Sequence, residues 1–97
     1  MIAPRRCVFA RIPPRPSTDW DDLHYLLETM RQGGMSAAAR SLGVDHATVG
    51  RRLRRLEQRL RQPVLDRQRR GLALTPFGEA VHAEAERMHD AAATVAR

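Results

Sequence analysis

The fold of this chain is decided by residues 36–60, which read SAAARSLGVDHATVGRRLRRLEQRL. The alanine-rich first part predicts a short helix over residues 36–42, with Ser36 as its N-cap. Gly43 ends that helix, because glycine accepts the left-handed backbone found at many helix C-termini. Asp45 then caps a second helix. Two helices joined by so tight a turn predict a helix-turn-helix.

The second of these helices has two faces of opposite character. Its apolar residues recur at steps of four, three and four, which predicts one buried stripe, made of Val49, Leu53, Leu56 and Leu60. The window of residues 51–70 holds nine arginines and two acidic residues, a net charge of +7. The whole chain has a formal charge of +6, so the remainder is close to neutral. This concentration of charge predicts a nucleic-acid partner.

Length and composition restrict the other possibilities. Ninety-seven residues make one small domain with a limited core, so stabilisation by a second subunit is expected. The single cysteine, Cys7, excludes an intramolecular disulfide and a cysteine-rich zinc site. No apolar run approaches the roughly 18 residues that a membrane span requires. We expect a cytoplasmic, nucleoid-associated protein with no membrane partner.

Residues 1–18 differ in composition from the rest of the chain. They contain four arginines, four of the six prolines and no acidic residue. Such a segment resembles both a disordered basic tail and a transit peptide, but Pro13, Pro14 and Pro16 oppose the amphipathic helix of a transit peptide. We therefore expect a disordered Pro/Arg-rich tail, for which an alternative start site is a simple origin.

Signals on either side of residues 36–60 extend the pattern. A helix is expected from Asp19 to the Gly33-Gly34 pair, because its apolar residues have helical spacing and acidic residues lie in its first turn. After Pro63, two short apolar runs flank a polar segment that ends in Gly71, which predicts a two-stranded β wing. The expected fold is mainly α: a winged helix-turn-helix over residues 19–75 with a three-helix core.

A long helix is expected over residues 76–97, since Thr75 is a good N-cap and Pro76 suits the first helical position. An apolar stripe runs along it at steps of four, four, three, four and three, formed by Phe77, Val81, Ala85, Met88, Ala92 and Val95. Two interpretations are open. The helix is either a core helix with a frayed end, or a linker helix that pairs with its copy across a two-fold axis.

This order of elements resembles the N-terminal DNA-binding domain of LysR-type transcriptional regulators. The resemblance covers about four fifths of the chain and is carried by LHYL at 23–26, SAAARSLGV at 36–44, ATV at 47–49, RRL at 51–53, RLE at 55–57, PVLDR at 63–67 and LTPFGE at 74–79. It implies binding of promoter DNA by a homodimer formed through the linker helix. In that family an effector-binding domain normally follows. The present chain stops at Arg97, as an excised domain or a naturally short protein would, so we expect no small-molecule effector site in it.

The chain departs from the family pattern at four positions. Arg61 stands where the family has the glycine that ends the helix, and Gln62 replaces the apolar residue before Pro63. Leu65 replaces phenylalanine and Gly50 replaces serine. A mid-helix glycine costs about 0.5–1 kcal/mol relative to alanine, so the departures predict lower stability and altered operator binding.

The N-terminal part of a recognition helix meets base edges in the major groove. The predicted base contacts are His46, Ala47, Thr48, Arg51 and Arg52. An arginine here suits guanine O6 and N7, and a small apolar group suits a thymine methyl. His46 stands where the family commonly has glutamine, and a solvent-facing role at the helix start is its alternative.

Residues farther along the helix or on the wing are better placed for phosphates. The predicted phosphate contacts are Ser36, Arg55, Arg67, Arg69 and Arg70. Arg54, Arg59 and Arg61 suit a solvated helix face, and Glu57 is expected to pair with Arg61 four residues on.

The chain shows no catalytic constellation and implies no cofactor, and we expect that it is not an enzyme. Helical spacing brings together His82, Glu86, His89 and Asp90, a set that also suits an exposed helix side, so no metal site is expected. The leading hypothesis is sequence-specific binding of double-stranded promoter DNA by a bacterial LysR-like regulator. The alternatives are an interaction module that forms mixed dimers with full-length relatives and a non-specific nucleoid-type binder.

Overall fold

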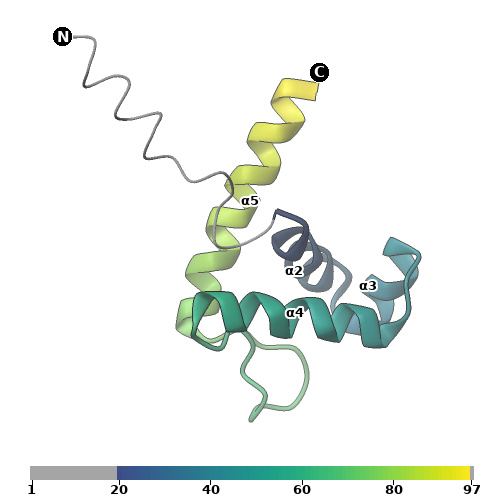
Figure 1. Ribbon diagram of the computed structural model, residues 1–97, viewed down its shortest axis with the longest axis vertical. Coiled ribbons are helices and arrows are strands. Elements are labelled where there is room, and N and C mark those ends of the chain that lie inside the picture. Colours follow the sequence, from purple (N-terminus) through teal and green to yellow (C-terminus); the bar gives the residue numbers. More distant parts are fainter. Residues whose placement is uncertain (1–19, 97) are drawn as a thin grey trace, which may run out of the picture.

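The computed structural model describes residues 20–96, so the expected tail of residues 1–18 lies outside the described part of the chain. Its helices are α2 (Trp20–Gln32), α3 (Met35–Leu42), α4 (His46–Leu60) and α5 (Pro76–Ala96). Figure 1 shows α2 and α3 on one side of α4, with the wing on the other side and α5 crossing near the end of α4. The expected order of helices is confirmed.

The core forms around α2, which packs against α3, α4 and α5. Leu26 and Leu27 of α2 have no exposed surface. From α4, Val49, Leu53 and Leu56 are buried, and Leu60 packs half-buried at the edge of the same cluster. The predicted apolar stripe of α4 is therefore confirmed, and its burial fixes which side of the helix faces solvent.

The turn between α3 and α4 follows the expected chemistry. Gly43 has a left-handed backbone with φ of 72°, and its N–H donates to the carbonyls of Ala39 and Arg40. Asp45 caps α4, because its carboxylate accepts the N–H of Thr48 at 2.8 Å. Both predicted caps are confirmed.

The N-cap predicted for α3 is wrong. The helix begins at Met35, its N-cap is Gly34, and no side chain caps it. Gly33 adopts a φ of 82°, which turns the chain directly after α2. The carbonyl of Gly34 then accepts the N–H of Ala38 at 3.1 Å. Ser36 consequently lies inside the first turn of α3 and does not precede it.

The wing, residues 64–74, is simpler than the predicted hairpin. Within the described residues it contains no strand, and a single antiparallel bridge joins Leu65 to Leu74. Two backbone bonds flank the bridge, from the Asp66 N–H to the Ala73 carbonyl and from the Thr75 N–H to the Val64 carbonyl, both at 2.9 Å. Toward the base of the wing the next ladder bond would need the N–H of Val64, which donates instead to the carboxylate of Glu57 in α4 at 2.7 Å. Backbone donors taken by a side chain cannot extend a β ladder.

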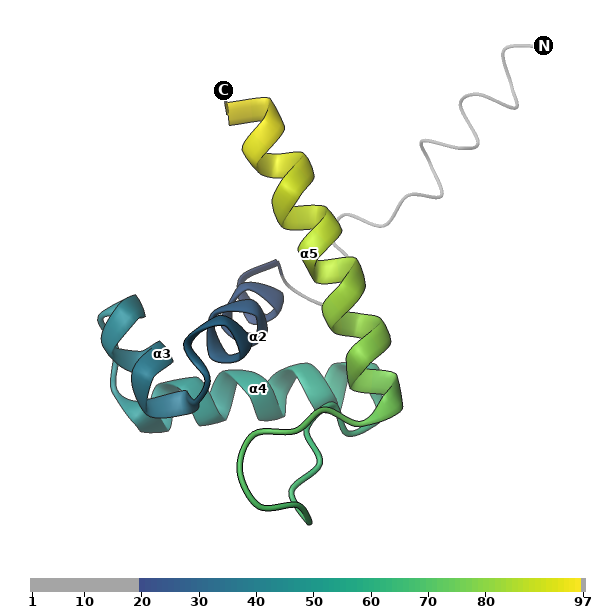
Figure 2. The same cartoon turned by 180° about the vertical axis from the view of Figure 1, so that it is seen from behind.

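Helix α5 begins as predicted, with the Thr75 hydroxyl oxygen accepting the N–H of Gly78 at 2.9 Å. Gly78 is buried so tightly against the backbone of Val64 that a Cβ there would overlap the Val64 carbonyl oxygen. Figure 2 shows the C-terminal part of α5 extending beyond the other helices. Among residues 20–96, none of the helices combines the length and the apolar character needed to span a bilayer.

Candidate nucleic-acid interface

The five predicted base-contact residues lie in the first two turns of α4, but their exposure differs. His46, Ala47 and Arg51 are exposed, whereas Thr48 and Arg52 are half-buried. The buried stripe on the opposite side of α4 holds the helix in this orientation. Three of the five side chains are therefore directly open to a ligand.

A chain of hydrogen bonds organises the start of α4. Asp45 Oδ1 accepts both the backbone N–H and the hydroxyl of Thr48, at 2.8 and 2.6 Å. Arg51 Nη2 donates to the Thr48 hydroxyl oxygen at 3.2 Å. The hydroxyl and the N–H of Thr48 lower the pKa of Asp45, so its carboxylate stays charged at neutral pH. Thr48 thus orients Arg51 through a hydroxyl that is itself held in place.

Arg52 and Arg55 share a buried acid on another helix. The Asp22 side chain has no exposed surface, and Arg52 Nη1 lies 3.1 Å from its Oδ1. Arg55 Nε lies 3.3 Å from its Oδ2. The Arg52 guanidinium also lies 5.1 Å from the centre of the Tyr25 ring, and its hydrogen bond to Asp22 raises the pKa of Arg52. These contacts tie α4 to α2 and engage two of the arginines predicted to contact DNA.

Asp22 itself was missed in the sequence, where it counted only as an acid in the first helical turn. A signal was present, however. Asp22, Leu26 and Thr29 are spaced by four and three residues, which places the acid on the buried face of α2. An acid on such a face requires a partner, because an unpaired buried charge is costly.

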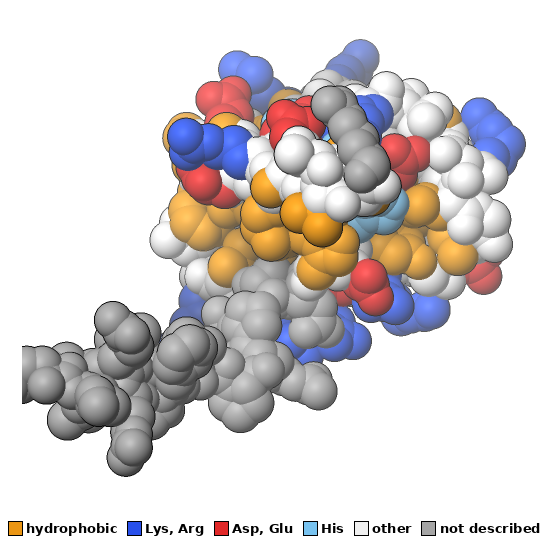
Figure 3. All heavy atoms as spheres, turned by 90° about the horizontal axis from the view of Figure 1, so that it is seen from above, with side chains coloured by type: hydrophobic (Ala, Val, Ile, Leu, Met, Phe, Trp, Pro, Cys, Tyr) orange, Lys and Arg blue, Asp and Glu red, His pale blue; other side chains and the backbone are white. Residues whose placement is uncertain are grey.

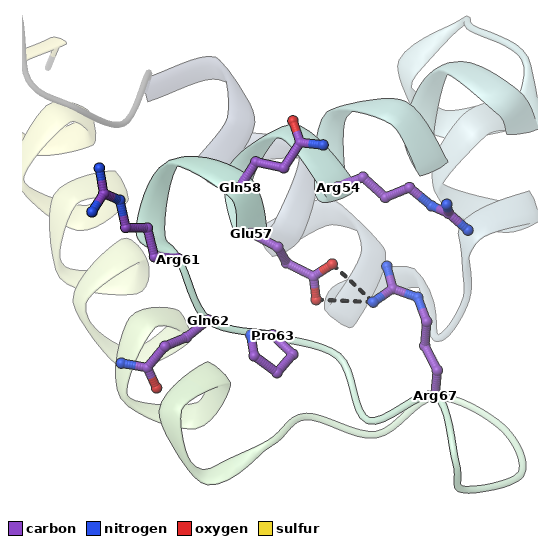
Figure 4. Close-up of a pocket in the computed structure, with 7 residues that line it drawn as sticks. All are labelled: Arg54, Glu57, Gln58, Arg61, Gln62, Pro63 and Arg67. Carbon is purple, nitrogen blue, oxygen red and sulfur yellow. Dashed lines mark hydrogen bonds and ion pairs between the residues drawn. The ribbon is translucent and has the colours of Figure 1, made fainter.

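The wing arginines differ in their partners. Arg67 Nη1 donates to both carboxylate oxygens of Glu57, at 2.8 and 3.0 Å. Arg69 is largely exposed, and its Nε lies 3.9 Å from Asp66 Oδ2, a long distance for an ion pair. Arg70 is exposed as well. The expected pair between Glu57 and Arg61 is wrong, because Glu57 turns toward the wing and Arg61, at the helix end, points away from it (Figure 4).

Shallow hollows show which of the predicted residues the fold brings together. One has Ser36 of α3, His46 of α4 and Gly71 of the wing among its lining residues. Another joins α4 to the wing through His46, Ala47, Arg51, Arg54 and Arg67. The start of α3, the start of α4 and the wing therefore form one continuous surface. Arg54, which the sequence placed on a solvated helix face, belongs to it.

The apolar stripe of α5 divides into two parts. Phe77 and Val81 pack against the core, and Ala85 is fully buried within it. The second part is open: Met88 is 43% exposed, Val95 is 86% exposed, and Ala92 is exposed. An apolar groove of about 290 Å³ beside it is lined by Leu23, Leu60, Ala80, Val81, Glu84, Ala85 and Met88. Figure 3 looks down on the end of the molecule to which α5 points and shows apolar side chains gathered there among charged ones.

The polar side of α5 is occupied by contacts with α2. Arg31 Nη2 lies 2.7 Å from a Glu86 carboxylate oxygen, and the rings of His24 and His89 stack with their centres 6.3 Å apart. His82 Nε2 lies 3.7 Å from Glu86. Within residues 20–96, no three acidic, histidine or cysteine side chains converge as a metal site would require. Glu86 and His89 take part in the packing of α5 against α2.

Comparison with known proteins assigns this geometry to a family. The family model described as "Bacterial regulatory helix-turn-helix protein, lysR family" matches residues 20–79. The chain belongs to the LysR family. Two curated LysR-type matches are the AhcY transcriptional activator HvrB of Rhodobacter capsulatus and the HTH-type transcriptional activator TtdR of Escherichia coli.

HvrB is 47% identical over 53% of this LysR-family chain and 18% of its own length. TtdR is 43% identical over 60% of the chain and 19% of its own length. The chain therefore spans about a fifth of the length of these relatives. Among solved structures, a crystal structure of the CbnR DBD–DNA complex is similar, with a TM-score of 0.73 and 30% identity over 81% of this chain and 91% of that one. The mainly helical fold is that of a LysR DNA-binding domain.

Proposed function

We propose that residues 19–75 bind double-stranded promoter DNA sequence-specifically, as the DNA-binding part of a bacterial transcription regulator. One observation carries the proposal: the exposed side of the first turns of α4 presents Arg51 together with His46 and Ala47, while the opposite side is buried. The similarity to the CbnR DBD–DNA complex supports DNA as the ligand. The role is recruitment and occupation of DNA, without covalent chemistry, in the bacterial cytoplasm.

Within this surface we assign different tasks to different residues. Arg51 is the main candidate for guanine, because its guanidinium is exposed and held by only one side-chain contact among those described above. Together with His46, Ala47 and Thr48 it forms the part of α4 that we expect to contact bases, which we call the base-reading end. Arg52 has a secondary role in base contact, because its guanidinium is already bound to Asp22.

Phosphate contacts follow from the outer positions of the surface. We assign them to the side chains that flank the base-reading end, namely Ser36, Arg54, Arg55, Arg67, Arg69 and Arg70. Residues 76–97 serve as the linker helix of a homodimer, in which Met88, Ala92 and Val95 provide the open apolar contacts.

The test uses a duplex selected by the chain itself from a random-sequence pool, together with a random duplex of equal length. Arg51→Ala should reduce the preference for the selected duplex by roughly 5- to 150-fold, the range of one bidentate base contact. Arg69→Ala should weaken both duplexes alike and lower the salt slope of binding by about 0.9 for each subunit bound. Equal affinity of the unaltered chain for both duplexes would instead indicate the non-specific binder.

A further inference from the structure

We infer that Glu57 is a positioning residue for DNA binding, whose carboxylate fixes the wing to α4 so that Arg67 and the base-reading end meet a duplex as one surface. The inference rests on the proposed function. Glu57 is an acidic residue within the arginine-rich window of residues 51–70. Its negative charge cannot itself attract the phosphates of DNA.

The hydrogen bonds of the Glu57 carboxylate all lead to the wing. Its Oε2 accepts the N–H groups of Val64 and Leu65 at 2.7 and 3.0 Å. Arg67 Nη1 donates to Oε1 at 2.8 Å and to Oε2 at 3.0 Å. The Glu57 side chain is only 12% exposed, so water competes little for these bonds. One carboxylate therefore holds both the backbone at the base of the wing and the first wing arginine.

Backbone bonds join the two sides of the wing, and the buried side chains of Val64 and Leu65 anchor its base in the core. Within the described residues the two sides form a single bridge, between Leu65 and Leu74. The bonds that tie Arg67 to α4 come from Glu57. Figure 4 shows Glu57 reaching from α4 toward Arg67, which lies across the hollow between the helix and the wing. The same Arg67 lines the hollow that contains His46 and Arg51. Fixing Arg67 therefore places a positive charge beside the base-reading end.

The charge of Glu57 makes the inference testable. A carboxylate beside a duplex repels phosphates, so its removal by itself should strengthen binding to any sequence. A glutamine in its place has one acceptor oxygen, and its NH₂ group would face a wing N–H or the Arg67 guanidinium, none of which accepts a hydrogen bond. Loss of positioning should weaken binding only where the wing and α4 must act together, which is on the selected duplex. Positioning and charge thus act in opposite directions.

The experiment compares Glu57→Gln with the unaltered chain on the selected and the random duplex over a range of salt concentrations. We expect affinity for the selected duplex to fall at least about tenfold, while affinity for the random duplex is unchanged or higher. Glu79→Gln is the matched control, because it removes the same charge at an exposed position of α5. It should leave the ratio of the two affinities unchanged.

Two further measurements separate positioning from general destabilisation. In Glu57→Gln the amide protons of Val64 and Leu65 should exchange faster, while those in the middle of α4 keep their protection. Arg67→Gln, which leaves the Glu57 bonds to the backbone intact, should lower the preference for the selected duplex by a smaller factor than Glu57→Gln. The inference is overturned if Glu57→Gln weakens both duplexes by the same factor, or if the two amides exchange as before. If the unaltered chain shows no preference between duplexes, the proposed function fails, and the exchange data still decide whether Glu57 holds the wing.

Discussion

Asp22 shows, at the scale of a single residue, how a DNA-binding surface depends on a group that faces away from it. Its carboxylate has no exposed surface and contacts Arg52 and Arg55 on α4, each of which retains a third or more of its side-chain exposure. The acid removes part of their freedom and leaves part of their charge open to solvent. It also joins two helices that are otherwise held mainly by apolar packing.

Asp22→Asn should lower the free energy of unfolding by about 1.5–3 kcal/mol, the range for hydrogen bonds to charged groups. The loss should stay below the 3–5 kcal/mol of a fully buried broken pair, because both arginines can turn toward water. Urea unfolding followed by circular dichroism measures it. The control is Asp21→Asn, an exposed acid in the same helical turn, which should change stability by less than about 0.5 kcal/mol. Equal effects of the two substitutions would show that the ion pairs contribute nothing.

At this scale the sequence was informative about exposure and less so about partners. The helical period placed Val49 and Leu53 inside and His46, Ala47 and Arg51 outside, because one amphipathic helix determines all five. It could not show that Arg52 binds Asp22 thirty residues earlier or that Glu57 binds the wing. Those pairs depend on how separate elements pack, which local spacing does not encode.

The C-terminus of α4 has an unusual cap for a helix. Arg61 adopts a left-handed backbone with φ of 60°, and its N–H donates to the carbonyl of Glu57. A left-handed conformation costs an ordinary L-residue roughly 1–2 kcal/mol, and glycine avoids most of this. The family pattern has glycine at this position, and the structure explains why.

Arg61→Gly should therefore stabilise the chain by about 0.5–1 kcal/mol, after allowance for the greater freedom of glycine in the unfolded state. Thermal and urea unfolding should both report the gain. Gln58→Gly provides the contrast, since Gln58 is an exposed residue inside α4 and glycine there should destabilise by about 0.5–1 kcal/mol. Destabilisation by both substitutions would mean that the left-handed cap of Arg61 is not strained.

The elements themselves were largely predictable. Caps at Gly43, Asp45 and Thr75 follow from short-range chemistry, and the structure has all three. The wing was predicted as two strands because apolar runs flank a glycine. The pairing is limited to one bridge, and at the base of the wing the Val64 N–H that would continue the ladder donates to Glu57 of another element. The N-cap of α3 is Gly34 and not the predicted Ser36, because the Gly33-Gly34 pair turns the chain before it reaches the serine.

For the whole molecule, the feature of interest is the exposed apolar surface at the C-terminal end of α5. The apolar residues of this helix pack against the core as far as Ala85 and are exposed beyond it. The sequence could identify the stripe but not the point at which the domain stops covering it, because that point depends on the size of the core. The exposed part adjoins an apolar groove, which suits the same part of a second copy.

Met88 lines this groove and is 43% exposed. Met88→Asp should weaken self-association by at least about tenfold, because it replaces an exposed apolar side chain of the groove with a charged one. Sedimentation equilibrium over a range of concentrations measures the dissociation constant. Ala83→Asp adds the same charge at an exposed position of α5 that does not line the groove, and it should leave association unchanged. A chain that stays monomeric at high concentration, or a dimer indifferent to Met88→Asp, would rule out this surface.

The close approach of Gly78 to Val64 limits how this sequence can diverge. Any side chain at position 78 would push the carbonyl of Val64, next to the N–H that Glu57 binds, and so disturb the junction of three elements at once. The neighbouring Glu79 and Ala80 are exposed and open to substitution. In a library of random variants screened for DNA binding, position 78 should remain glycine, while the two positions that follow it vary freely.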